Sequence, residues 1–490
     1  MAAIITEQFR QHNAEQFFES FSEISLSKYF LFIGKSTPYT SNTSGGNDNS
    51  PPLPIDDVST NFYNWDGMLG AKQITSSDIA YVIPRRNWSN GTVYDMYEHN
   101  ISATNTATSG STSLWESTFY FITSELKVYK VIDNNNGAAY NGTEPTTISS
   151  VPFSLGGYIL QYMFTVSGSR AEKFLTNDFI PVETDSTISA AAVHGSIDAI
   201  KVAAGSGYTD GTYYSSINGD GTGGIVKIIV SGGSIASFGS GASNSEVYSV
   251  GNNYTYGTVD LTDVYSDTGL ISATSIGTGT NGSVSPIISP KGGHGFNPFY
   301  ELAAHFVMMA VKLEQAEGDD ITVLNDFRQL GIVVDPYNFG TTTVATASTI
   351  RQSFAIKLAA APITDFIVDE KITQSTTGAV GRVVEWDSGN NIIYYIQEKY
   401  SEYGIDSTGN YVAFSGANLI VGDTSTASGT PSSTSSENVT LSGGTVLTFS
   451  SGYLNPELEP DSGKIIYTEN RRPITRASDQ SENIKIIVEF

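Results

Sequence analysis

Apolar residues along the chain fall mostly in short runs, a pattern that predicts many β-strands and few helices. Near the start, residues 6–22 place Phe9, Ala14 and three further phenylalanines on one broad face of a predicted helix, with Thr6 as its N-cap. In residues 157–166, four large residues alternate with smaller or polar neighbours, as in a strand with one buried face. Similar apolar runs predict the other strands of this part at residues 29–33, 79–84, 117–122, 127–132 and 179–182.

The pattern changes at residues 184–289, where Gly, Ser, Thr, Ala and Tyr dominate. Two related segments lie there, and each is a short apolar run followed by GSGYTDGTYY or by GNNYTYGTVD. The corresponding tyrosines, Tyr208 and Tyr254, are 46 residues apart. Two copies predict a duplicated strand–turn–strand unit, because a solenoid generally needs three or more repeats. We therefore expect an inserted Gly-rich β domain.

The remaining sequence returns to an ordinary composition and then changes again. Asn297-Pro298 is a helix-start signal, but the end of that helix stays open because residues 305–313 also suit a strand. A strand is predicted at residues 353–358. Turns at 377–379 and 387–390 separate short strands in what we interpret as a small barrel-like β module. Residues 424–444 are a predicted Ser/Thr/Gly-rich linker, and residues 484–488 a final strand.

The fold class predicted from these patterns is mainly β, with a β-sandwich core, short helices and two inserted Gly-rich β domains. The core would be built from three separate stretches of the chain. The predicted division is 1–183 (N-terminal helix and first part of the core), 184–289 (inserted domain), 290–364 (second part of the core), 365–430 (inserted module) and 431–490 (linker and C-terminal core strands).

The charge balance excludes some partners. The 490 residues include 25 basic and 50 acidic side chains, a net charge of −25, so a row of phosphates would not be neutralised. Nucleic-acid binding is disfavoured for this reason, and an anionic membrane surface would repel the chain. No apolar run approaches the length of a membrane span, so no membrane insertion is expected. The absence of cysteine removes thiolate chemistry and fits a reducing compartment.

The residues that could carry chemistry form no convincing group. The closest pair of the five histidines, His294 and His305, is eleven residues apart, unlike the pairs that hold catalytic zinc. Gly205-Ser206-Gly207 lacks the spacing of a nucleophile elbow. Asn218 and Asp220 could offer oxygens to calcium, but a plain turn is the favoured interpretation. Paired carboxylates for glycoside cleavage stay open. We predict no catalytic residue, no cofactor and no metal ligand.

Two pairs of adjacent arginines stand out in a chain with so few basic residues. Each pair is next to a proline, which stiffens the backbone and reduces the entropy lost on docking. A solvated strand end is one interpretation. The other is a docking role, in which guanidinium groups bind carboxylates of a partner or of another part of the chain. The candidate interface residues are Pro84, Arg85, Arg86, Trp88, Glu469, Asn470, Arg471, Arg472 and Pro473.

The two arginine-bearing stretches also carry a family resemblance. The segments AYVIPRRNWSNGTVYDMY (80–97) and IIYTENRRPITRASDQSENIKIIVEF (465–490) resemble motifs of the dimeric baseplate wedge subunit of T-even-type contractile phages. The same holds for YFLFIGKSTPYTS (29–41) and for GYILQYMFTV and NDFIPV within 157–182. The resemblance covers residues 1–183 and 452–490, and 290–362 weakly. The two Gly-rich stretches depart from the family and look like insertions found in phages of marine cyanobacteria.

The resemblance implies a structural role without catalysis or cofactor. It implies a β-sandwich core, a homodimer that binds other baseplate wedge subunits, assembly in the host cytoplasm, and a place in the virion tail baseplate, which rearranges when the sheath contracts. The alternative is a carbohydrate-binding or depolymerase tail protein, because Gly/Tyr/Thr-rich β modules also occur in adhesins.

Overall fold

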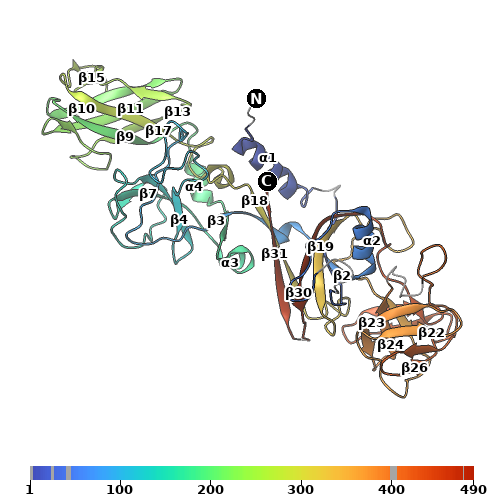
Figure 1. The fold of residues 1–490 in the computed structure, drawn as a ribbon. Coiled ribbons are helices and arrows are strands. Elements are labelled where there is room, and N and C mark those ends of the chain that lie inside the picture. The colour runs from blue at the N-terminus through green and yellow to red at the C-terminus, as the bar shows by residue number, and fades with distance from the viewer. Residues whose placement is uncertain (1–3, 24–26, 40–45, 398–404, 478) are drawn as a thin grey trace. The chain divides into compact units, whose positions relative to one another are not determined.

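The computed structural model describes residues 4–23, 27–39, 46–397, 405–477 and 479–490. The chain forms two compact units, each assembled from separate stretches of sequence. Unit 1 comprises residues 1–16, 80–308 and 487–490, and unit 2 comprises residues 17–79 and 309–486. Both consist mainly of antiparallel strands joined by turns, with a few short helices (Figure 1). The predicted mainly β class is confirmed.

The first sheet of unit 2 has the strand order β20-β2-β1-β19-β30. Its central strand β1 is apolar and buried on both faces, and Phe30 and Phe32 pack against Trp65 of helix α2 (Val58–Asp66). Asp57 caps that helix by accepting a hydrogen bond from the amide of Thr60 at 2.7 Å. The strands are β20 (Thr349–Arg351), β2 (Met68–Ile74), β1 (Tyr29–Gly34), β19 (Phe327–Val334) and β30 (Lys464–Ile474).

The second sheet of unit 2 contains the module predicted after residue 365. The predicted turns are confirmed, because residues 377–379 join β22 to β23 and residues 387–390 join β23 to β24. The strand predicted at 353–358 is β21, which pairs with β24 and therefore lies in this same sheet. In order, its strands are β26 (Ser428–Gly429), β25 (Ile420–Gly422), β22 (Lys371–Gln374), β23 (Val380–Asp387), β24 (Ile392–Ile396), β21 (Phe354–Lys357) and β29 (Tyr453–Leu454).

The stretch predicted as a linker at residues 424–444 is not one continuous linker. It contributes β26 to the module and then β27 (Glu437–Thr440), which forms a hairpin with β28 (Val446–Phe449). Small polar residues hid this hairpin from the hydrophobic pattern, although Leu447 and Phe449 of β28 are buried.

Unit 1 contains a four-stranded sheet in the order β4-β5-β7-β6 and a pair of strands, β3 with β8. The strand predicted at residues 157–166 is confirmed as β7, but both its faces are buried, since only its last residue is exposed. Aromatic rings pack around the sheet, as in the edge-to-face contact of Tyr140 with Tyr158. The elements are β3 (Ile79–Pro84), β4 (Tyr120–Ile122), β5 (Lys127–Asp133), β6 (Phe153–Leu155), β7 (Tyr158–Thr165), β8 (Phe179–Pro181), α3 (Gly168–Phe174) and α4 (Ser186–Ala191).

The Gly-rich stretch of unit 1 folds into strands around a core of Ile, Val and Tyr side chains. A long antiparallel pair, β9 with β17, packs with a second sheet in which β11 is hydrogen-bonded to β10, β12 and β13. The strands are β9 (Ile197–Ser206), β10 (Gly211–Gly219), β11 (Thr222–Ser231), β12 (Ser234–Ile235), β13 (Glu246–Asn252), β14 (Gly257–Val259), β15 (Val264–Tyr265), β16 (Ala273–Thr274) and β17 (Thr280–Ile288).

The two similar segments in this stretch do form equivalent strand–turn–strand units, β9 to β10 and β13 to β14. In each, the turn tyrosine lies over glycines of the partner strand. The hydroxyl of Tyr208 accepts from the amide of Gly282 at 3.0 Å, and that of Tyr254 accepts from the amide of Gly224 at 3.1 Å. A Cβ added to either glycine would lie within 3.0 Å of the tyrosine, so these glycines make the close approach possible.

The N-terminal helix α1 (Glu7–Glu19) begins as predicted, and the Thr6 hydroxyl accepts from the amide of Phe9 at 3.3 Å. Its predicted apolar face is buried only in part. Ala14 is buried and the later phenylalanines are half-buried, but Phe9 is exposed, whereas Glu7 and Gln11 are buried. Polar partners explain the difference, because Glu7 pairs with His305 and Gln11 donates to the carbonyl of Tyr300.

The helix predicted to start at Asn297-Pro298 is only one turn long. Helix α5 (Pro298–Glu301) is followed by strand β18 (Phe306–Glu314), so the strand interpretation of residues 305–313 is the right one. The final predicted strand is confirmed as β31 (Ser481–Glu489). Among the described helices, none is long and apolar enough to cross a membrane.

Candidate functional site

The first arginine pair follows β3 and makes contacts inside unit 1. Arg85 donates to the Asn87 side chain at 2.8 Å and to the Thr176 carbonyl at 2.7 Å. Arg86 donates to the Ser117 carbonyl, and its guanidinium lies 4.4 Å from the centre of the Tyr120 ring. Both guanidinium groups of this pair therefore have partners within the unit.

The other two candidates at this end of β3 are half-buried. Pro84 accepts a hydrogen bond from the Tyr120 hydroxyl at 2.8 Å, and Trp88 makes an edge contact with Tyr140. Both contacts hold the chain after β3 against the aromatic core of unit 1. The structure thus gives these residues internal partners, and their role at an interface stays a prediction.

The second arginine pair lies in β30, at the edge of the first sheet of unit 2. Arg471 and Arg472 are exposed, and consecutive strand residues point to opposite faces. Arg471 lies 3.5 Å from Glu469. The Arg472 guanidinium has no hydrogen bond or ion pair with any residue that the structure describes. These two arginines are therefore available to a partner on either side of the sheet edge.

Neighbours of the second pair fix the backbone that presents it. The Asn470 side chain accepts from Gln329 at 2.9 Å and donates to the Pro52 carbonyl at 3.0 Å. Pro473 lacks an amide hydrogen, which suits an edge strand and discourages pairing with a further strand. Binding at this edge would therefore use side chains. The two arginine pairs lie in different units, and each is an independent candidate.

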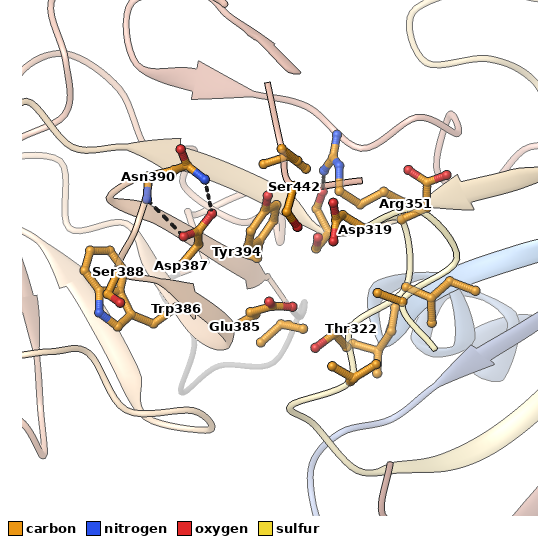
Figure 2. Close-up of a pocket in the computed structure, with 18 residues that line it drawn as sticks. Asp319, Thr322, Arg351, Glu385, Trp386, Asp387, Ser388, Asn390, Tyr394 and Ser442 are labelled. Carbon is orange, nitrogen blue, oxygen red and sulfur yellow. Dashed lines mark hydrogen bonds between the residues drawn. The ribbon is translucent and has the colours of Figure 1, made fainter. Parts of the chain in front are cut away.

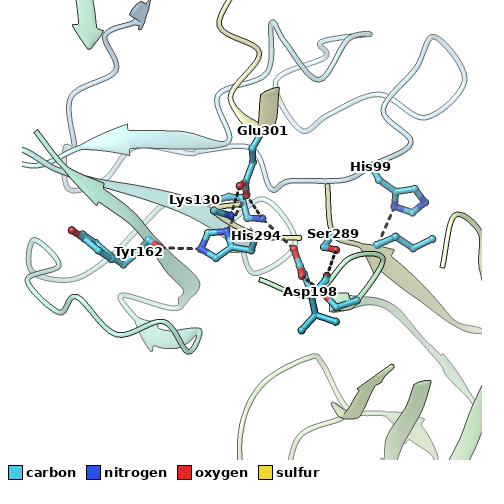
Figure 3. A network of polar contacts seen from close by, with 11 residues as sticks. His99, Lys130, Tyr162, Asp198, Ser289, His294 and Glu301 are labelled. Carbon is cyan, nitrogen blue, oxygen red and sulfur yellow. Dashed lines mark hydrogen bonds and ion pairs between the residues drawn. The ribbon is translucent and has the colours of Figure 1, made fainter. Parts of the chain in front are cut away.

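A buried group of charged residues in unit 1 was not predicted from the sequence (Figure 3). Lys130 of β5 is fully buried, and its ammonium lies 2.7 Å from Glu301 and 3.1 Å from Asp198. Glu301 belongs to α5 and Asp198 to β9, so three elements meet there. Lys130 interrupts the apolar run between Val128 and Ile132 in β5, and such a charge in a buried run was the available sequence signal.

His294 completes this group. Its Nδ1 is 2.9 Å from the Glu301 carboxylate, and its Nε2 is 2.9 Å from the Tyr162 carbonyl. Each ring nitrogen of His294 therefore has an oxygen atom within hydrogen-bond distance. We call Lys130, Asp198, His294 and Glu301 the buried charge network.

Electrostatics within the network favour the charged forms. Burial alone would raise the pKa of the Glu301 carboxyl, but Lys130 and His294 lower that pKa to about 2. Burial likewise opposes the charge of Lys130, yet the two carboxylates raise its pKa. Every charge has a partner inside the protein, which is the arrangement of a structural network.

The other histidines have structural contacts or are exposed. His99 and His194 accept from the amides of Ile288 and Gly292, His305 pairs with Glu7, and His12 is exposed. Asp220, considered above as a calcium ligand, instead accepts from the amide and hydroxyl of Thr255. Within the described ranges, no three His, Cys, Asp or Glu residues are grouped so that they could hold a metal ion.

Unit 2 contains a pocket of about 370 Å³ between the β23–β24 hairpin and the loop at residues 316–323 (Figure 2). Its walls are strongly polar. Glu385 and Asp387 come from β23, and Tyr394 from β24 lies directly opposite Glu385 in the ladder. Arg351, Asp319, Asp320, Thr322, Ser388, Asn390 and Ser442 also line it.

Burial changes the titration of groups in this pocket. It raises the pKa of the Glu385 carboxyl, although a hydrogen bond from Thr322 opposes the change. It also raises the pKa of the Asp320 carboxyl and of the Tyr394 phenol, and lowers the pKa of the Arg351 guanidinium. The sequence analysis missed this site, because its residues come from separate stretches and only the fold brings them together.

Comparison with known proteins finds similar sequences for one part of the chain. The family model described as "Bacteriophage T4, Gp8" matches residues 3–151. The baseplate wedge protein gp8 of Enterobacteria phage T4 is 32% identical over 101 residues, which are 20% of this chain and 30% of that protein. The aligned part thus spans less than a third of the relative's length. The resemblance seen in the sequence to the baseplate wedge family is confirmed over this N-terminal range.

Proposed function

From the relationship of residues 3–151 to the Gp8 baseplate wedge family, we propose that this chain is a structural subunit of a contractile phage tail baseplate. It would lie in the baseplate wedge of the virion, after assembly in the host cytoplasm, and bind neighbouring wedge proteins as a homodimer. It would follow their rearrangement when the sheath contracts. The relationship of the N-terminal segment is the observation that carries the proposal.

The β30 edge supports a specific docking surface within this proposal. Arg471 and Arg472 project from a strand whose backbone is held by Asn470, and Pro473 discourages strand pairing. Guanidinium groups held on a rigid element lose little entropy when they bind carboxylates. The chain itself carries 50 acidic residues, so a second copy offers suitable carboxylates as well as a neighbouring wedge subunit does.

The first arginine pair contributes less to this surface. Its hydrogen bonds to Thr176 and Ser117 would have to break before either guanidinium could bind a partner. We therefore assign Arg85 and Arg86 chiefly to the stability of unit 1, with Pro84 and Trp88. We infer a role in assembly without catalysis, since function would depend on binding surfaces held in place by the β framework.

The double substitution Arg471→Ala and Arg472→Ala tests this proposal. We expect the thermal unfolding temperature to stay near that of the wild type, while the mass in solution falls from dimer to monomer and co-assembly with co-expressed wedge proteins is lost. Light scattering after size-exclusion chromatography measures the mass.

The matched control is the double substitution Arg85→Ala and Arg86→Ala, which should lower the unfolding temperature and leave assembly of the folded fraction intact. A wild-type chain that stays monomeric and joins no wedge complex would contradict the proposed function itself. Normal assembly of the Arg471→Ala and Arg472→Ala variant would contradict only the docking surface.

A further inference from the structure

The pocket of unit 2 contains a tyrosine hydroxyl that no described residue uses. Tyr394 is only 6% exposed, and its ring is fixed in β24 by pairing with β23. Its hydroxyl has no hydrogen bond within the described residues, although it lies in the field of Arg351, Glu385 and Asp387. The ring is buried but the hydroxyl oxygen is not, so this hydroxyl can reach a molecule that enters the pocket.

Arg351 provides a second unused group at the same place. This side chain is 3% exposed, and its two terminal nitrogens donate to the carbonyls of Ser353 and Asn455. Its Nε is buried and has no hydrogen-bond partner among the described residues. Arg351 lines the pocket, so an unused donor lies in its wall together with the unused Tyr394 hydroxyl.

Acceptors surround these donors. Glu385 and Asp387 project from one face of β23, and Asp319 lies in the loop on the other side of the space (Figure 2). One oxygen of Asp319 accepts from the amide of Gly443, and Asp387 accepts from the amide and side chain of Asn390. Each carboxylate has further lone pairs, so all of them keep capacity for a ligand.

The charges of the pocket decide between classes of ligand. An anion would be repelled by the carboxylates of Glu385, Asp387 and Asp319. A cation would be attracted by them, but it would leave the Tyr394 hydroxyl and the Arg351 Nε without an acceptor. A neutral polyhydroxylated molecule can bind both the carboxylate acceptors and the Tyr394 and Arg351 donors, because each of its hydroxyls both donates and accepts.

The size and walls of the pocket fit the same class. Its volume of about 370 Å³ is at the lower end of the range for small-molecule sites, about 300–1,000 Å³. Tyr394 contributes an aromatic ring to the wall, on the same face of the sheet as Glu385. Trp386 alternates with Glu385 and Asp387 along β23, so its indole lies on the other face, where it packs against Phe366. An aromatic wall beside carboxylates and hydroxyls suits a sugar ring, which has apolar C–H groups as well as hydroxyls.

We propose that this pocket binds one neutral sugar residue of a glycan, with Tyr394 and Arg351 as donors and Glu385 and Asp387 as acceptors. The site would serve recognition, and it is independent of the wedge assembly proposed above. A tail protein with such a site would hold a surface glycan through unit 2 while it binds other proteins through its β30 edge.

Saturation-transfer NMR on the full chain tests this assignment. The probes are the methyl glycosides of glucose, galactose, mannose and N-acetylglucosamine, each added alone at the same concentration. We expect transfer to at least one glycoside. Binding should weaken about tenfold in Tyr394→Phe, which removes only the hydroxyl, and in Glu385→Gln, which removes only the charge and one acceptor.

The matched control is Tyr248→Phe, which removes the hydroxyl of a tyrosine exposed in unit 1 and should leave binding unchanged. Thermal unfolding verifies that each variant is folded, and Glu385→Gln decides the test if Tyr394→Phe does not fold. The proposal is overturned if no glycoside receives transfer, or if both pocket variants bind as the wild type does. Binding of methylammonium in place of every glycoside, abolished by Glu385→Gln, would overturn it in favour of a cation site.

Discussion

The two units bury charge in opposite ways. In unit 1, Lys130, Asp198, His294 and Glu301 satisfy one another, and Glu301 also accepts from the amide of Gly295. In unit 2, the pocket around Glu385 leaves the Tyr394 hydroxyl and the Arg351 Nε without described partners. We call the network of unit 1 closed, because its charged groups pair with one another and leave little capacity for a ligand. The pocket of unit 2 is open, because donors and acceptors in its wall remain unpaired. Buried charge alone therefore does not indicate a binding site, and the state of its hydrogen bonds has to be examined.

The largest expected effect comes from breaking the closed network. Lys130→Met would leave two buried carboxylates without the ammonium group that contacts both, and we expect a loss of about 3–5 kcal/mol in the stability of unit 1. Hydrogen exchange measured by mass spectrometry should show faster exchange in peptides of β5 and β9, with β1 and β19 of unit 2 unchanged. Exchange as slow as in the wild type would mean that the network is not structural.

A matched lysine shows whether burial is the reason. Lys201 lies in the same unit and pairs with Glu98 at 2.9 Å, but its side chain is 47% exposed, whereas that of Lys130 is fully buried. Lys201→Met should therefore cost less than Lys130→Met, because it leaves one buried carboxylate without its cation and not two. Equal effects of the two substitutions would remove the distinction between a fully buried lysine and a half-exposed one.

The pH dependence of stability should have opposite signs at Glu301 and Glu385. The folded-state pKa of Glu301 is lowered to about 2 from 4.5, so its contribution is complete above 4.5 and is lost as the pH falls toward 2. Up to about 3 kcal/mol is involved. The pKa of Glu385 is raised above 4.5 by burial, so its ionisation weakens the folded state as the pH rises through that raised value.

Calorimetric unfolding of two glutamine variants measures how the stability contributed by Glu301 and by Glu385 changes with pH. The advantage of the wild type over Glu301→Gln should shrink as the pH is lowered from 7 toward the acid range. Glu385→Gln should be more stable than the wild type at pH 7, and the difference should disappear in acid. If both differences change in the same direction with pH, the contrast between closed and open charge is contradicted.

The arginine pairs extend the comparison to the surface. Arg86→Ala removes hydrogen bonds to two carbonyls and a contact with the Tyr120 ring, and should cost about 2 kcal/mol. Arg472→Ala removes no described contact and should change stability by less than about 0.5 kcal/mol. Urea unfolding of the monomer compares them. A cost for Arg472→Ala equal to that of Arg86→Ala would mean that both pairs stabilise the fold.

The sequence predicted the strands whose apolar runs were continuous, such as β1 and β3, and the start of α1 from its cap. It did not predict β2, β19 or β30, where glycine or charged residues interrupt the run, as Gly331 does beside Phe32. Tertiary contacts determine such strands, and local pattern cannot reveal them. The same reason explains why Phe9 of α1, which was predicted to lie on the buried face, is exposed.

The same distinction between local sequence pattern and tertiary contacts applies to the candidate sites. The arginine pairs are visible as local sequence, yet only the fold reveals that one is bound internally and the other is exposed. Lys130 was visible as a charge within an apolar run, whereas its partners Asp198 and Glu301 are distant in sequence. The pocket had no local signal, because Arg351 and Tyr394 become neighbours only when β24 folds onto the rest of unit 2.

The smallest expected effect distinguishes the two copies of the repeated hairpin in unit 1. The Tyr254 hydroxyl is buried, accepts from Gly224 and donates to the Ile217 carbonyl, so Tyr254→Phe leaves two buried groups unpaired and should cost about 1–2 kcal/mol. Tyr208 is only partly buried, and water can replace its hydroxyl at Gly282, so Tyr208→Phe should cost less than about 0.5 kcal/mol. Hydrogen exchange at Gly224 and Gly282 measures both. Because the sequence units are alike, equal effects would mean that the repeat, and not the burial of its copies, determines what each hydroxyl contributes.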